Sequence, residues 1–459
     1  MLEDRILDIV IVGGGRLGSG IANSLSQENH NITVVDINEE LVNSIVDTYD
    51  VQGVIGSGTI RSVLSDANVQ RADLVIGATD EDEINILTCF IARRMGARHT
   101  IARVRNPEYT SQINFMRNEL GISMMLNPDL SAALEISRMI QFPSAMNIET
   151  FSNGLVDLAE IKVGTDSPIA DMKIGSISSK YNNRLLICAV ARGEEVYIPN
   201  GDFTVQTGDV VYITASNKYI GAIVKDLNPS KKVENIKNVM IIGASRIAFY
   251  LANLLVSQGK NVVLIDRDNE KCEAFSDKIS GATVVCADAN DYNVLLEEGL
   301  DDMDAVVTLT NHDEVNVMVS MFSARQNVPK NITKIKNVNL AKLVDNISTD
   351  SIINPISTST DIITHYIRAK KHASSGEMKA LYKLVDGKIE ATEFIADSKT
   401  KNLGKPLSQI DFKKNILIAS IGRKGKLIIP TGSESIQDGD KIIIVSKGRI
   451  IEKINDIFS

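Results

Sequence analysis

The chain has 459 residues, of which 44% are hydrophobic and 23% are charged, a composition typical of a folded globular protein. Its formal net charge of −9 at pH 7 argues against a nucleic-acid-binding protein, because such a protein presents a basic surface to the phosphates. No apolar run approaches the roughly 20 residues that a membrane-spanning helix needs.

The compartment predicted for the chain is the cytosol. The acidic start, residues 1–5, has the pattern of neither a signal nor a transit peptide and leads straight into a predicted strand. The cysteines show no paired spacing, which favours buried thiols in a reducing compartment. They are Cys89, Cys188, Cys272 and Cys286.

One unit occurs twice in the sequence. An apolar run at residues 9–12 leads into the turn Gly-Gly-Gly-Arg-Leu-Gly, and the same arrangement recurs 230 residues later as Gly-Ala-Ser-Arg-Ile-Ala. Asp36 and Asp266 each end the next apolar run. Other landmarks recur at an offset of 231, namely residues 78–85 with 309–316, and 198–211 with 429–442. A constant offset over so many landmarks indicates two tandem copies of a two-domain unit.

Each copy begins with alternating strand and helix patterns, which predict a doubly wound parallel sheet with helices on both faces. The strands expected are residues 9–12, 32–35, 51–55, 74–78 and 100–104, and then 239–242, 262–265, 283–285, 305–309 and 331–335. Each copy then changes to short alternating strands, expected at residues 155–163, 185–191, 196–199 and 210–214, and at 381–385, 416–421, 427–430 and 441–445.

The fold class predicted is therefore α/β, with two Rossmann-like doubly wound parallel-sheet domains alternating with two small β-rich α+β domains. The polar segment at residues 225–238, which contains Pro229, is the best linker between the two copies. A further boundary is expected near residues 373–376. The domains predicted are residues 1–145, 146–230, 236–372 and 373–459.

The first glycine-rich turn has the pattern of a dinucleotide-binding loop. Gly13 permits a tight turn, Gly15 lets the backbone approach a pyrophosphate, and Gly18 lets the following helix pack closely on the strand. The helix N-terminus attracts the phosphates, and Asp36 accepts hydrogen bonds from ribose hydroxyls while disfavouring a 2′-phosphate. The pattern favours NAD(H) or an adenosine nucleotide over NADP. The alternative is a turn that only packs the sheet.

Other candidate ligand-binding residues lie at the carboxyl ends of later strands, where ligands bind in open α/β sheets. Gly58 and Thr59 follow the third strand, and Thr79 and Asp80 follow the fourth. Arg103, in the fifth strand, could grip a phosphate with two parallel hydrogen bonds, and a surface salt bridge is its alternative role.

The second copy departs from the pattern at three positions. Ser245 replaces the middle glycine, Ala248 replaces the last, and Lys334 stands where the first copy has Arg103. Asp266 and Thr310 remain. Nucleotide binding by this copy therefore stays open, as weaker binding or as binding of a different nucleotide.

No catalytic or metal-binding motif appears in the sequence, and no enzyme activity is predicted. The five histidines share no motif, and the small β-rich domains offer no evident acid or base for a dehydrogenase. Asn85 and Asn316, which are equivalent in the two copies, are interpreted as part of a helix cap.

Taken together, these motifs resemble the TrkA-type regulatory subunits of bacterial potassium uptake systems, which are built from tandem RCK (regulator of conductance of potassium) units. The resemblance rests on the first glycine turn with Asp36, residues 78–83 and 101–109, and the Ile-Pro-x-Gly…Gly-Asp signature at 198–209 and 429–440. It covers residues 9 to about 450. It implies nucleotide contacts at Gly13, Gly14, Gly15, Arg16, Leu17, Asp36, Thr79, Asp80 and Arg103, and at Gly243, Ala244, Ser245, Arg246, Ile247, Asp266 and Thr310.

The resemblance also implies a function and partners. It implies a cytoplasmic assembly, a homo-oligomer and specifically a tetramer, held peripherally at the inner face of the membrane by a TrkH-like potassium channel or transporter subunit. Binding of NAD(H) or ATP/ADP would then alter potassium flux. Because each glycine turn carries an arginine, Arg16 or Arg246, we expect phosphate to contact Arg16 or Arg103 near a subunit boundary in one arrangement only.

Two other functions remain open from the sequence. One is an NAD-dependent oxidoreductase, and the other is a nucleotide sensor for a different transporter. The sequence does not decide which nucleotide is the effector, or whether the small domains bind cyclic di-AMP as those of some relatives do.

Overall fold

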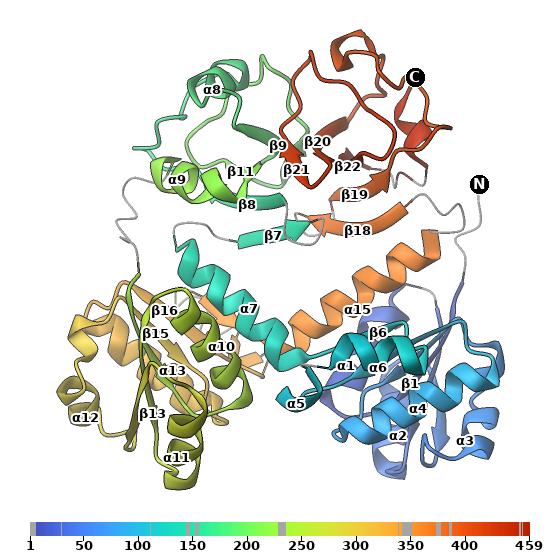
Figure 1. Cartoon of the computed structure of the whole chain (residues 1–459), viewed down its shortest axis with the longest axis vertical. Coiled ribbons are helices and arrows are strands. Elements are labelled where there is room, and N and C mark those ends of the chain that lie inside the picture. The colour runs from blue at the N-terminus through green and yellow to red at the C-terminus, as the bar shows by residue number, and fades with distance from the viewer. Residues whose placement is uncertain are drawn as a thin grey trace. The chain divides into compact units, whose positions relative to one another are not determined.

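The chain divides into two compact units in the computed structural model (Figure 1). One comprises Met1–Ser137 with Ile236–Thr364, and the other comprises Arg138–Asn235 with His365–Ser459. The residues described are 6–28, 30–110, 112–143, 147–151, 156–227, 236–337, 339–341, 351–372, 378–384, 388–448, 451 and 453–459. The predicted boundary at 373–376 and most of the predicted linker, residues 228–235, lie outside them. The boundaries of the four predicted domains stay a prediction.

The first unit contains two lobes, and each is built on a six-stranded sheet. In the first lobe (residues 8–137) the strand order is β3-β2-β1-β4-β5-β6, and every pair is parallel. This is the order of the dinucleotide-binding Rossmann fold. Its strands are β1 (Asp8–Val12), β2 (Asn31–Asp36), β3 (Gln52–Ile55), β4 (Leu74–Gly77), β5 (His99–Arg103) and β6 (Met124–Leu126).

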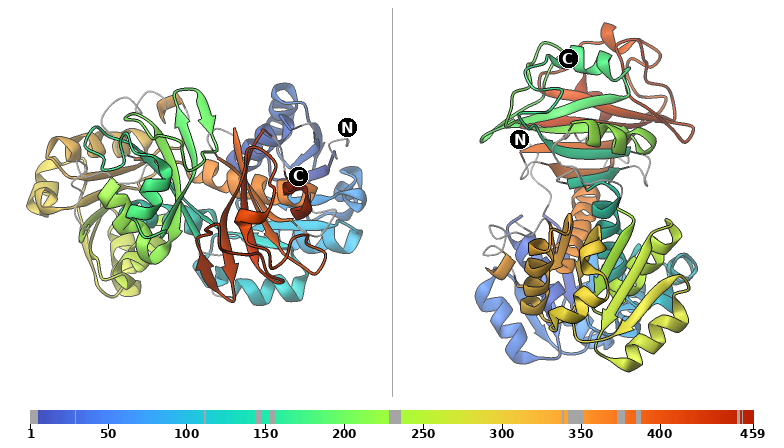
Figure 2. Two further views of the ribbon diagram at one scale, coloured as in Figure 1. Left: turned by 90° about the horizontal axis from the view of Figure 1, so that it is seen from above. Right: turned by 90° about the vertical axis from the view of Figure 1, so that its left-hand side faces the viewer.

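Helices cover both faces of this sheet, as the alternating pattern predicts (Figures 1 and 2). The central strand β1 is apolar throughout its buried length because both of its faces are covered, and Ile11 has no exposed surface. The helices are α1 (Arg16–Ser26), α2 (Glu39–Thr48), α3 (Arg61–Asp66), α4 (Asp82–Met95), α5 (Pro107–Thr110), α6 (Ile113–Leu120) and α7 (Pro128–Gln141).

The second lobe (residues 238–364) repeats this topology, in the order β14-β13-β12-β15-β16-β17. Its strands are β12 (Asn238–Ile242), β13 (Asn261–Asp266), β14 (Ala282–Cys286), β15 (Ala305–Thr308), β16 (Lys330–Lys334) and β17 (Ser351–Ile353). Its helices include α10 (Arg246–Ser257), α11 (Asn269–Lys278), α12 (Tyr292–Glu297), α13 (Asp313–Arg325) and α15 (Pro355–His372). The sixth strand of each lobe, β6 or β17, was not predicted from the sequence, because three residues are too few to show a period.

The second unit contains two antiparallel five-stranded sheets, in the orders β10-β9-β11-β8-β7 and β18-β19-β22-β20-β21. The first comprises β7 (Asn147–Phe151), β8 (Val156–Lys162), β9 (Leu185–Arg192), β10 (Glu195–Tyr197) and β11 (Val210–Ser216), with α8 (Ile174–Lys180) and α9 (Asn217–Leu227). The second comprises β18 (Met378–Leu384), β19 (Ile389–Ile395), β20 (Ile416–Arg423), β21 (Lys426–Ile428) and β22 (Lys441–Lys447). The strand expected at 381–385 is β18, and the sequence analysis missed its partner β19.

A shared apolar core joins the two sheets of this unit. Tyr212 of β11 and Ile443 of β22 both belong to it and are almost fully buried. The Gly-Asp signature also has a structural role. Asp209 is held by Arg192 through two bonds of 2.8 Å, and Asp440 by Arg423 through bonds of 2.9 and 2.8 Å.

The two lobes of the first unit are joined by a small buried polar cluster. Tyr250 of α10 in the second lobe donates its hydroxyl hydrogen to the carbonyl of Arg105 at 3.2 Å. The same oxygen accepts from Nδ2 of Asn127 at 2.9 Å and lies 3.1 Å from the hydroxyl of Thr110. Elsewhere in the same unit, Thr358 of α15 donates to Glu135 of α7 at 2.8 Å. One tyrosine hydroxyl thus contacts three groups of the opposite lobe.

Replacing Tyr250 by Phe tests this junction. The change keeps the ring but removes the hydroxyl, so that buried groups on the first lobe lose their partner. We expect a loss of about 1–2 kcal/mol in the free energy of unfolding, measured by urea denaturation of the full chain. Unchanged stability would show that the hydroxyl does not hold the lobes together.

Candidate functional site

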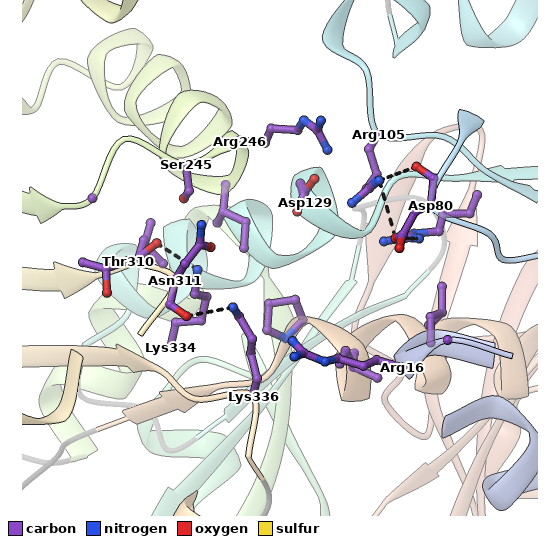
Figure 3. Close-up of a pocket in the computed structure, with 18 of the residues that line it drawn as sticks. Arg16, Asp80, Arg105, Asp129, Ser245, Arg246, Thr310, Asn311, Lys334 and Lys336 are labelled. Atoms are coloured by element: carbon purple, nitrogen blue, oxygen red, sulfur yellow. Dashed lines mark hydrogen bonds and ion pairs between the residues drawn. The ribbon is translucent and has the colours of Figure 1, made fainter. Parts of the chain in front are cut away.

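A cavity of about 1230 Å³ opens between the two lobes and is lined by both (Figure 3). It is larger than the roughly 300–1,000 Å³ of ordinary ligand pockets. The predicted binding residues of both copies line it, with two exceptions: Gly14 and Thr59 do not. The sequence analysis treated the two glycine turns as separate sites, and the structure instead places them at one continuous cavity.

The first glycine turn is shaped by close backbone packing. Gly13 has φ +105°, and a Cβ atom there would lie 2.6 Å from the amide nitrogen of Thr79. A Cβ atom on Gly18 would lie 1.8 Å from the carbonyl oxygen of Gly13. Gly15 is different, because a Cβ atom there would meet no protein atom within 4 Å. Gly13 and Gly18 are therefore needed by the fold, whereas Gly15 faces open space in the cavity.

Asp36 ends β2 beside this turn and fixes its shape. Its Oδ2 accepts from the amide of Gly14 at 2.7 Å, and its Oδ1 accepts from the amide of Asn38 at 2.9 Å. Gly14 faces α2, since a Cβ atom there would lie 3.0 Å from Cδ1 of Ile45, and it does not line the cavity. Asp36 itself lines the cavity, and its predicted contact with a ribose stays a prediction.

Asn85 corrects one interpretation made from the sequence. It does not cap the start of α4, since the N-cap residue is Glu81. Instead its buried side chain joins the ends of two strands. Oδ1 accepts from the amide and hydroxyl of Thr79 at 2.8 and 2.7 Å, and Nδ2 donates to the carbonyls of Thr79 and Arg103 at 3.0 and 3.1 Å. In the second lobe, Asn316 makes the same four bonds with Thr310 and Lys334.

Two arginines and one carboxylate follow strands four and five and line one end of the first lobe's site, which we call its far end. Arg103 donates from NH1 to the carbonyl of Thr79 at 2.8 Å and to Oδ1 of Asp80 at 3.0 Å. Arg105 donates to the carbonyl of Asp80, and its NH2 lies 3.7 Å from the carboxylate. The hydrogen bond from Arg103 lowers the pKa of Asp80, whose side chain is 90% exposed. Asp80 therefore partly neutralises both arginines.

The second glycine turn differs from the first at Ser245, which stands where the first turn has Gly15. Gly243 keeps the geometry of Gly13, with φ +102° and a Cβ position 2.8 Å from the amide of Thr310. Asp266 accepts from the amide of Ala244 at 2.6 Å, as Asp36 does from Gly14. Ser245 caps α10 by accepting from the amide of Ala248 at 3.3 Å, and its own amide donates to the carbonyl of Gly243 at 2.9 Å. The turn thus uses some of its own amides internally.

Lysines replace the arginines at the far end of the second lobe. Lys334 is buried and donates to the carbonyl of Leu309 at 2.8 Å. Burial lowers the pKa of its ammonium group to about 8, and the nearby Lys336 acts in the same direction. Lys336 donates to the carbonyl of Asn311 at 3.1 Å. At neutral pH both side chains bring positive charge to the cavity.

The sequence analysis missed several residues that line the cavity. Arg105 and Lys336 each lie two positions after the predicted fifth-strand cation and recur at the repeat offset, a signal that could have found them. Asp129 lies between Arg105 and Arg246 (Figure 3), and burial is the main cause that raises its pKa. No motif marked it, because it depends on the meeting of the two lobes. Arg267 and Lys271 also line the second lobe's part.

Among the described residues, no three or more His, Cys, Asp or Glu side chains gather as metal ligands, and no helix is both long and apolar enough to cross a bilayer. Cys89, Cys188 and Cys272 are buried thiols, whereas Cys286 is exposed, contrary to the expectation that all four would be buried.

Comparison with known proteins decides the family. The TrkA-N domain matches residues 9–128 and 239–355, and the TrkA-C domain matches residues 158–228 and 391–459. The Trk system potassium uptake protein TrkA homolog of Archaeoglobus fulgidus is 30% identical over 98% of this chain and 99% of its own length. The chain belongs to the TrkA family. The TrkA protein of Halomonas elongata is 28% identical over 97% of both chains.

Solved structures share the fold of this TrkA-family chain. A structure of the GsuK channel has a TM-score of 0.66 at 18% identity and covers 98% of this chain and 78% of its own. The GsuK RCK domain has a TM-score of 0.63 at 18% identity and covers 98% and 94%. The GsuK channel bound to NAD has a TM-score of 0.64 at 18% identity and covers 98% and 78%. The fold predicted from the sequence is confirmed.

Replacing Asn85 by Ala tests the role assigned to this side chain. The change removes four hydrogen bonds, and the amide of Thr79 and the carbonyl of Arg103 lose the partner that Asn85 supplies. We expect a loss of about 3 kcal/mol in the free energy of unfolding, measured by urea denaturation. The control is Asn114→Ala at an exposed position of α6, where a change within about 0.5 kcal/mol is expected. Equal effects of the two substitutions would contradict the role of Asn85.

Proposed function

We propose that this chain is the cytoplasmic nucleotide-binding regulatory subunit of a Trk-type potassium uptake system. It couples binding of NAD(H) or ATP/ADP to potassium flux through a membrane partner. Membership of the TrkA family and the names of its relatives support the link to potassium uptake. The binding residues, the tetramer, the TrkH-like partner and the peripheral membrane location belong to this proposal.

The observation that carries the proposal is the open position of Gly15 at the N-terminus of α1. Because nothing fills the space above it, a pyrophosphate can approach the turn and the helix N-terminus. Asp36 lies beside the same space to accept from a ribose. GsuK structures described as bound to NAD and to ADP support a ligand of this class.

The position of the cavity explains how binding could regulate. Its walls come from both lobes, so a nucleotide there would contact both lobes at once and would favour the mutual arrangement that binds it better. A ligand shifts an equilibrium only by its preference for one arrangement. A tenfold preference supplies about 1.4 kcal/mol per site, so several sites in a tetramer could open or close a channel.

A regulatory role is favoured over an oxidoreductase by what lines the cavity. Hydride transfer to a small substrate needs an acid or base close to the nicotinamide. Among the described lining residues the one histidine is His312, which is exposed at the start of α13. The arginines and lysines around it suit phosphate binding better than proton transfer.

Replacing Gly15 by Asp tests the binding site without unfolding the lobe. Gly15 is the N-cap of α1 with φ −59°, which any residue adopts, and aspartate is a favourable N-cap. The added carboxylate occupies the predicted phosphate position. We expect unchanged stability without ligand and loss of the rise in melting temperature that NADH gives the wild type. Saturating ligand at 100 times Kd stabilises by about 2.7 kcal/mol.

The matched control is Asn23→Asp, which adds the same charge at an exposed position of α1. It is expected to bind NADH like the wild type. In cells that depend on this system for potassium, Gly15→Asp should abolish the NADH-dependent part of potassium uptake. A Gly15→Asp protein that binds NADH normally would refute the proposed site.

A further inference from the structure

The two ends of the cavity carry different charge, which bears on the ligand of each lobe if the proposed function holds. The first lobe lines it with three arginines and four carboxylates, and the second with five cations and two carboxylates. The arginines and carboxylates of the first lobe are Arg16, Arg103, Arg105, Asp36, Asp80, Glu81 and Asp129. The cations and carboxylates of the second are Arg246, Arg267, Lys271, Lys334, Lys336, Asp266 and Asp288, and His312 lines it as well.

The largest difference in charge between the two lobes lies just after the fourth strand of each. Asp80 and Glu81 in the first lobe correspond to Asn311 and His312 in the second. The backbone frame is the same, because Lys336 donates to the carbonyl of Asn311 as Arg105 donates to that of Asp80. The second lobe therefore lacks two carboxylates after its fourth strand, although the backbone there has the same hydrogen bond as in the first lobe.

Arg16 adds to the charge there, although it belongs to the first lobe. A smaller cavity of about 330 Å³ is lined by Arg16 together with second-lobe residues that include Asn311 and Lys336. Figure 3 shows the Arg16 side chain pointing toward Lys336. Asp313 and Glu314 also line this space, and they correspond to Asp82 and Glu83 of the first lobe. The Oδ2 of Asp313 accepts from the amides of Lys336 and Asn337, as Asp82 accepts from the corresponding amides of the first lobe. Because both lobes have these two carboxylates, they do not account for the difference between the lobes.

The part of the second lobe's lining that lies beside Asp266 also carries cations that the first lobe lacks. Arg267 and Lys271 stand where the first lobe has Ile37 and Leu41, and all four line the cavity. Lys271 pairs with Asp268 at 3.3 Å, which leaves Arg267 as the larger change at this end.

The turn itself differs in a way that fits this charge. The amide of Ser245 donates to the carbonyl of Gly243, and its hydroxyl oxygen accepts from the amide of Ala248. The second turn therefore depends less on its amides for phosphate binding, and the side-chain cations supply the attraction instead.

We propose that the second lobe selects a nucleoside triphosphate, whereas the first lobe selects a dinucleotide. A terminal phosphate over the far end of the second lobe would meet Lys334, Lys336 and Arg16. At the far end of the first lobe the exposed carboxylate of Asp80 repels a terminal phosphate, yet it can accept from the hydroxyls of a dinucleotide's second ribose.

Titration calorimetry of the full chain tests this division, with NADH and ATP as probes and a chelator present so that ATP keeps its full charge. Gly15→Asp should abolish NADH binding and leave ATP binding within about twofold. Ser245→Asp, which retains an N-cap, should do the reverse. If both nucleotides bind the wild type and Gly15→Asp abolishes both, the division is wrong while the proposed function stands. If neither binds the wild type, the proposed function fails as well.

Asn311→Asp isolates the charge itself. It gives the second lobe a carboxylate at the position where the first lobe has Asp80. We expect the affinity for ATP to fall by about tenfold or more and the affinity for NADH to stay unchanged. Asn327→Asp, an exposed second-lobe position that does not line the cavity, is the control and should change neither affinity. Equal ATP binding by Asn311→Asp and the wild type would overturn the proposal.

Discussion

Close packing between the first glycine turn and the end of the fourth strand is the constraint on which each lobe depends. A side chain at Gly13 or Gly243 would overlap the backbone of Thr79 or Thr310, so the turn can take one shape only. The threonine is in turn held by Asn85 or Asn316. Because this contact fixes both the N-terminus of the following helix and the loop after the fourth strand, it brings the two parts of the proposed nucleotide site together.

The two lobes keep the same backbone arrangement around the cavity but differ in the charge of the side chains that line it. The aspartate that ends the second strand and the buried asparagine make the same bonds in both copies. What differs is charge, since Asn311 and His312 stand where the first lobe has Asp80 and Glu81. Substitutions of this kind cost the fold little, since the side chains reach into the cavity, but they alter its attraction for phosphate.

Much of this organisation could be predicted from the sequence because the repeat offset and the strand–helix alternation are local signals. The fold class and the glycine turn were found in this way. The three-residue strands β6 and β17 escaped, since so short a segment shows no period. Asn85 was misread as a cap because its partners, Thr79 and Arg103, meet it only in three dimensions. The place of Asp129 in the cavity, and the joining of the two sites into one cavity, were missed for the same reason, because both depend on how the two lobes meet.

Hydrogen–deuterium exchange of the full chain, with and without nucleotide, tests most directly whether the cavity is a nucleotide site. The account predicts slower exchange at residues 13–18 and 79–81 when NADH is added, and at residues 243–248 and 310–312 when ATP is added. Unchanged exchange in all of these segments at saturating nucleotide, with protection confined to other parts of the chain, would contradict it.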